Sequence, residues 1–139
     1  MRVRVFIIIL LSACLSAVEA QQQMRAGLIA FYNLENLFDT IDTQGVLDEE
    51  FTPEGPNKWS GSRYLEKLDN MALAISRIGE DDGWSGGPAV LGVSEIENRS
   101  VLEDLAAHPL LKESNYQVVH YDSPDRRGVD VALMYRPRF

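Results

Sequence analysis

Four short apolar runs are spread along this chain, and their lengths predict the strands of one sheet. Strand-length runs occupy residues 27–32 and 89–94, and two more, at 116–121 and 129–135, are joined by a polar turn segment. Apolar runs of this length between turn residues predict strands. Helical patterns separate the first three runs. The order strand, helix, strand, helix, strand, strand therefore predicts a mixed α/β domain.

The longer helical pattern lies between the first two strands. Apolar side chains recur three and four residues apart from Tyr64 to Ile78, which predicts a helix with one buried stripe. Ser60 or Ser62 is suited to cap its start, and Gly79 to end it. A helical crossover of this kind makes the two flanking strands parallel, so their carboxyl ends lie at one edge of the sheet.

A second, shorter helix is predicted before the third strand. Ser100 and Glu103 have the spacing of a capping box, which places the helix start at Ser100. The helix is expected to end before Pro109, because the residue before a proline is biased away from helical geometry.

Composition and charge narrow the classes of function. The 139 residues are enough for one domain, and 45% hydrophobic residues are typical of a globular protein. A formal charge of −8 argues against binding nucleic acid through a basic surface alone, so a cation must help to neutralise any bound phosphate. The single cysteine, Cys14, excludes an intrachain disulfide and a cysteine-rich zinc site.

The first twenty residues have the pattern of an export signal. Arg2 and Arg4 precede an apolar run at 5–11, and small residues lead up to Ala20. We predict a signal peptide that is cleaved after Ala20. The remaining residues, 21–139, are then expected in the periplasm or outside the cell.

Residues 11–14 leave a second form of processing open. They resemble a bacterial lipobox, and lipid attachment to Cys14 is the alternative to cleavage after Ala20. The apolar run is shorter than the roughly 20 residues that a membrane-spanning helix needs. No transmembrane span is predicted, and both alternatives imply export.

Polar side chains follow each of the first two strands. Asn33 and Glu35 come directly after the first strand and Glu95 after the second, so all three are expected at one edge of the sheet. Carboxylate and carbonyl oxygens are the ligands that Mg²⁺ and Ca²⁺ prefer. The alternative for Asn33 and Glu35 is that they cap the backbone and face water. Glu97 is expected either beside Glu95 or in solvent.

The turn between the last two strands holds a second polar group. Arg126 and Arg127 match phosphate oxygens in geometry, so that phosphate binding with Asp130 is one interpretation and an Arg–Asp pair that fixes the hairpin is the other. Asp130 lies in an apolar strand and is expected to have a partner. For His120, ordinary packing is favoured over acid–base catalysis.

These motifs also resemble a known family. Residues 32–35 and 92–98 resemble the first two signature motifs of the endonuclease/exonuclease/phosphatase superfamily, which is deoxyribonuclease I-like. The longer pattern resembles a secreted bacterial branch of this superfamily and covers residues 31–39, 50–55, 95–99, 101–105 and 122–133.

The resemblance implies a fold and a reaction. The fold is a four-layer α/β sandwich, and the reaction is hydrolysis of phosphodiester or phosphomonoester bonds by water, assisted by Mg²⁺, with Mn²⁺ or Ca²⁺ as alternatives. By resemblance, Glu95 is the principal metal ligand together with Glu35, while Asn33 and Glu35 orient metal, water and phosphate. The substrate stays open among DNA, RNA, a phospholipid headgroup and a small phosphate ester.

The later motifs of the superfamily are absent from this sequence. They supply a histidine, an Asp-x-Asn pair and a late Asp-His pair, which are expected beyond Phe139 together with half of the sandwich. Residues 21–139 are therefore interpreted as the N-terminal part of a domain, inactive alone, with an unpaired apolar sheet face, and the full-length protein is expected to be monomeric. The alternative is an exported, non-catalytic binding domain. The presence of both Glu35 and Glu95 favours the enzyme.

Overall fold

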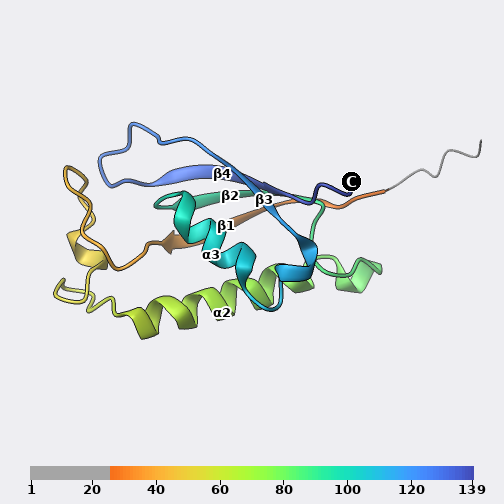
Figure 1. Ribbon diagram of the computed structural model, residues 1–139, viewed down its shortest axis with the longest axis horizontal. Helices are drawn as coiled ribbons and strands as arrows, with labels where there is room; N and C mark the ends of the chain where they lie inside the picture. Colours follow the sequence, from red (N-terminus) through yellow and green to blue (C-terminus); the bar gives the residue numbers. More distant parts are fainter. Residues whose placement is uncertain (1–25) are drawn as a thin grey trace, which may run out of the picture.

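In a computed structural model that describes residues 26–139, one sheet carries two helices on one of its faces (Figure 1). The predicted signal peptide and Cys14 lie outside the described residues. Among residues 26–139, no helix is long and apolar enough to cross a bilayer.

The sheet has four strands in the order β1-β2-β4-β3. They are β1 (Ile29–Leu37), β2 (Val90–Ile96), β3 (Gln117–His120) and β4 (Asp130–Tyr135). β1 and β2 are parallel, as predicted from the helical crossover, and β4 is antiparallel to both β2 and β3. The predicted mixed α/β class is confirmed.

The longer helix, α2 (Gly61–Arg77), begins and ends where the sequence predicts. The Ser60 hydroxyl accepts a hydrogen bond from the Arg63 N–H, which satisfies one of the free donors of the first turn. Gly79 follows with a φ of +86°, a left-handed conformation that glycine adopts without steric cost. The other helical segments are α3 (Arg99–Ala107) and the short 3₁₀ turns Glu49–Phe51, Glu80–Asp82 and Lys112–Ser114.

The hydrophobic core lies between the two helices and the sheet. Each helix contributes one apolar stripe, and alternate residues of the strands face it. Its members include Leu34, Leu37, Leu68, Ala72, Ile75, Leu91, Val93, Ile96, Val101, Leu102, Leu105 and Met134. This packing holds the carboxyl ends of β1 and β2 in place.

The cap of α3 differs from the prediction. Asn98, not Ser100, is the cap residue, and its Oδ1 accepts the Val101 N–H at 3.1 Å. β2 ends at Ile96 and Asn98 has extended backbone angles, so the helix begins at Arg99 and Ser100 is already inside it. The Ser100 hydroxyl donates to Asn98 Oδ1 instead.

This difference gives a testable prediction. Asn98→Ala is expected to lower the free energy of unfolding by about 1 kcal/mol, because the first turn of α3 loses its cap. Ser100→Ala, the matched control, is expected to change it by less than about 0.5 kcal/mol. Urea denaturation followed by circular dichroism measures both. Equal losses in the two variants would contradict the assignment of Asn98 as the cap.

The sheet face opposite the helices is apolar and exposed, as expected. Phe31 is 85% exposed and Val131 68%. A hollow of about 590 Å³ on this face is lined by residues of all four strands or their ends, including Phe31, Gly92, Val119, Val131 and Leu133.

Candidate functional site

The carboxyl ends of β1 and β2 meet the loop after β1 and the β3–β4 hairpin at one end of the sheet (Figure 1). Ile96, the last residue of β2, pairs with Asp130, the first of β4. The Leu47 N–H donates to the Arg126 carbonyl at 2.9 Å, which joins the loop to the hairpin. We call this end of the sheet the rim.

The backbone at the rim is bent in a way that the sequence does not reveal. The β1–β2 register shifts between Asn33 and Leu37, where Glu35 and Asn36 have φ of +51° and +61°. Glu95 on the neighbouring strand has a φ of +56°. Left-handed geometry costs a residue other than glycine about 1 kcal/mol or more. Such strained residues cluster at functional sites, which directs attention to Glu35 and Glu95.

Asn33 shapes the bend in β1. Its Oδ1 accepts the Glu35 N–H at 2.7 Å, the local capping contact that the alternative interpretation of this pair predicts. The capping amide fixes the backbone that carries the Glu35 side chain, so the contact also supports a role for Asn33 in placing Glu35.

The carboxylates of Glu35 and Glu95 are free to bind a ligand. Within residues 26–139, neither makes a hydrogen bond or a close ion pair. Both attract the ammonium of Lys67, whose pKa is lowered by burial. The Lys67 ammonium also donates to the Glu35 carbonyl. The carboxylates of Glu35 and Glu95 are therefore both attracted by the one ammonium of Lys67, and neither is hydrogen-bonded within the described residues.

Glu97 is neither in solvent nor arranged like Glu95. Glu97 is only 8% exposed. Its carboxylate accepts hydrogen bonds from the Asp39 N–H at 2.7 Å and from the Thr43 hydroxyl at 3.2 Å. Burial raises the pKa of Glu97 to about 7, and the nearby carboxylates of Asp39 and Asp48 contribute. Both donors come from a loop more than 50 residues away, so no local pattern indicates this environment.

The predicted Arg–Asp pair of the hairpin exists, but with a different aspartate. Arg127 Nη2 lies 2.9 Å from Asp125 Oδ2, and hydrogen bonds from the Arg127 side chain and backbone hold the pKa of Asp125 at about 2. Arg126 is exposed. Asp130 makes no ion pair with either arginine.

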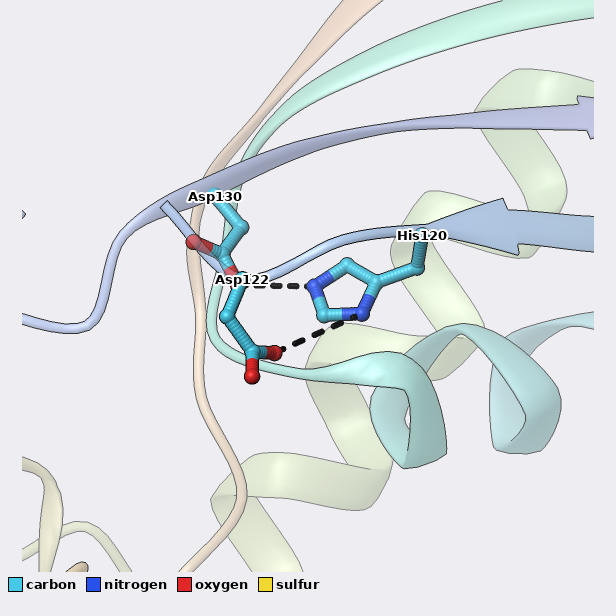
Figure 2. Close-up of side chains that lie close together, drawn as sticks. All are labelled: His120, Asp122 and Asp130. Atoms are coloured by element: carbon cyan, nitrogen blue, oxygen red, sulfur yellow. Dashed lines mark hydrogen bonds and ion pairs between the residues drawn. The ribbon is translucent and has the colours of Figure 1, made fainter. Parts of the chain in front are cut away.

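The partner of Asp130 is His120. The ring Nε2 of His120 lies 2.7 Å from Asp130 Oδ2, and Ser123 N–H donates to Asp130 Oδ1 at 2.7 Å. Figure 2 shows Asp130 at one ring nitrogen and Asp122 at the other, with His120 Nδ1 and Asp122 Oδ1 3.9 Å apart. The sequence does not reveal this pair, because the pairing register of β3 with β4 is what brings His120 and Asp130 together.

Beside this pair, the rim holds a cavity of about 280 Å³. Its described lining includes the acidic residues Glu97, Asp122, Asp125 and Asp130 but no lysine or arginine, and the polar residues Thr43, Asn98 and Ser123 complete the polar part. Such a lining favours cations over anions.

Open α/β sheets commonly bind ligands at the carboxyl ends of parallel strands, and this fold presents its unengaged carboxylates there. The sequence model of the Endonuclease/Exonuclease/phosphatase family matches residues 28–139, and the chain belongs to this family. No curated protein and no solved structure matches the chain. The family supports a phosphoesterase-type hydrolase, and its enzymes generally depend on divalent metal ions.

Proposed function

We propose that this protein hydrolyses phosphate esters with the help of Mg²⁺ held by Glu95 and Glu35. The proposal rests on the backbone geometry of these two residues and on their free carboxylate oxygens. Each has a strained left-handed backbone, they lie on neighbouring parallel strands, and their oxygens are unengaged among the described residues. Carboxylate oxygens fit Mg²⁺, which prefers oxygen ligands and keeps several waters.

Residues around the two carboxylates have supporting roles in this proposal. Asn33 orients Glu35 through the 2.7 Å contact with its N–H. Arg127 lies within electrostatic reach of Glu95, and with Arg126 it offers guanidinium groups to the phosphate. Asp130, bonded to His120 and Ser123, orders the hairpin that carries both arginines. A bound Mg²⁺ supplies charge that stabilises the phosphate oxygens while water attacks.

We also propose that the protein is exported, since its leader has the pattern of a signal peptide. The acidic charge of −8 favours a substrate whose phosphate is reached through a metal ion rather than through a basic surface. DNA, RNA, a phospholipid headgroup and a small phosphate ester all meet this condition.

Metal binding tests the proposal directly. Titration calorimetry with Mg²⁺ is expected to show one site whose affinity falls at least about tenfold in Glu95→Gln, because the amide has the same size but no charge. Glu103→Gln removes an exposed carboxylate on α3 and serves as the matched control, with an unchanged affinity. Equal Mg²⁺ affinities for the wild type and Glu95→Gln would overturn the site.

A further inference from the structure

The hairpin carries a second group of metal-ligating atoms that is separate from Glu35 and Glu95. His120, Asp122 and Asp130 each place one nitrogen or oxygen atom within 4.8 Å of the others. We propose that His120 Nδ1 and Asp122 bind a divalent metal ion such as Zn²⁺ or Mn²⁺. In this proposal Asp130 positions the imidazole without contacting the metal.

The contacts of Asp130 determine which ring nitrogen is available. An ionised carboxylate only accepts hydrogen bonds, and its two oxygens receive the Ser123 N–H and His120 Nε2. The proton of the neutral ring therefore lies on Nε2, and Nδ1 presents its lone pair. Metal-binding histidines in proteins almost always donate their other ring N–H in this way to a carboxylate, a carbonyl or water.

Nδ1, the other ring nitrogen of His120, has no hydrogen bond within the described residues. The His120 side chain is only 5% exposed, and the 3.9 Å from its Nδ1 to Asp122 Oδ1 is too long for a hydrogen bond. Nδ1 is not sealed from solvent, because Arg136 Nε is the only buried side-chain nitrogen or oxygen atom without a hydrogen bond among residues 26–139. Its lone pair is therefore unengaged and can be reached by a cation that Asp122 also binds.

The other histidine of the chain shows the opposite arrangement. His108 Nε2 lies 2.8 Å from Asp69 Oδ1, and its Nδ1 accepts the Leu110 N–H at 3.3 Å. Both ring nitrogens of His108 are engaged, so a metal would have to break a contact. The two pairs also differ in burial, since the Asp69 side chain is 72% exposed and the Asp130 side chain 6%. The engaged Nδ1 of His108 makes this residue a natural control.

The spacing at His120 suits a metal ion. With bonds of about 2.1 Å to nitrogen and oxygen, two ligand atoms lie about 3.4 Å apart at a tetrahedral angle and about 4.2 Å apart on a straight line. The observed 3.9 Å falls between these limits. The Asp122 side chain is 96% exposed and free to turn toward the ion. Asp122 also lines the cavity of about 280 Å³ at the rim, where solvent water would supply the remaining ligands.

The donor atoms select the class of metal. Mg²⁺ and Ca²⁺ take oxygen ligands, whereas a ring nitrogen paired with a carboxylate suits Zn²⁺ or Mn²⁺. The ring nitrogens of His120 point in different directions, and Nε2 is already 2.7 Å from Asp130. Asp130 therefore lies outside the coordination sphere, and the site has two protein ligands and an open side.

Zn²⁺ titration of the untagged protein tests the proposal, with a chromophoric chelator to report free metal. Asp122→Asn is expected to weaken binding at this site at least tenfold, and His120→Gln is expected to abolish it. His108→Gln and Glu95→Gln are expected to keep it, so a failure of the Mg²⁺ site leaves this site unaffected. Asp122 is exposed, so Asp122→Asn decides the question even if His120→Gln does not fold.

Nuclear magnetic resonance of the imidazole nitrogens gives a second readout. Zn²⁺ is expected to shift the His120 Nδ1 signal while the proton stays on Nε2, and Asp130→Asn is expected to mix the two ring tautomers and weaken binding. Wild-type Zn²⁺ affinity in both Asp122→Asn and His120→Gln would overturn the proposal. Zn²⁺ bound at Nε2 would overturn the positioning role of Asp130.

Discussion

Glu95→Gln is expected to lower Mg²⁺-dependent hydrolysis of a phosphodiester by roughly 10³-fold or more. A group that stabilises charge in the transition state is worth about 10² to 10³ in rate when it is a single hydrogen-bond donor. Glu95 is expected to exceed this, because its loss displaces the ion that stabilises the phosphate oxygens. The assay measures the hydrolysis of bis-p-nitrophenyl phosphate by the full-length protein.

Two comparisons make this result decisive. Glu103→Gln is expected to keep full activity, and a chelator is expected to abolish it. Activity that survives Glu95→Gln would mean that Glu95 has a structural role and that Glu35 and Asn33 are assigned wrongly as well. Rapid Mg²⁺-dependent turnover by residues 21–139 alone would contradict the expectation that later family motifs are required.

The buried carboxyl of Glu97 is expected to make stability fall as pH rises. Its pKa is about 7 in the folded protein, against an ordinary value of 4.5. Between these values the folded state holds a proton that the unfolded state has lost, so the free energy of unfolding decreases with pH. A difference of this size corresponds to about 3 kcal/mol between pH 4.5 and pH 7.5.

Glu97→Gln isolates this contribution. The amide oxygen still accepts the Asp39 N–H but carries no charge. With a chelator present, the variant is expected to match the wild type near pH 4.5 and to be about 3 kcal/mol more stable at pH 7.5. Glu54→Gln, at an exposed position, is expected to stay within about 0.5 kcal/mol of the wild type throughout. A stability difference for Glu97→Gln that does not change with pH would contradict the assignment.

Features set by local sequence were predictable in this protein. Ser60 and Gly79 mark the ends of α2 because a cap and a left-handed glycine act on the adjacent turn. The parallel pairing of β1 and β2 followed from the helix that joins them. The same local reasoning placed the cap of α3 at Ser100, whereas the end of β2 at Ile96 makes Asn98 the cap residue.

Features that depend on distant contacts were not predictable. The pairing of His120 with Asp130 requires the β3–β4 register, and the environment of Glu97 requires the loop that holds Asp39 and Thr43 to contact its carboxylate. The bend at Glu35 was hidden for another reason. Left-handed geometry is common for glycine, and a glutamate there gives no signal in the sequence.

The left-handed backbone at Glu35 and Glu95 has a consequence for how this protein evolves. Glycine would relieve the strain at either position, by about 1 kcal/mol or more, and would remove the carboxylate at the same step. Under the proposed metal site, stability and the acidic group are therefore under opposed selection at both positions. A lineage that no longer needs the carboxylates is expected to drift toward glycine or asparagine there, whereas a lineage that needs them must keep two glutamates at a standing cost in stability.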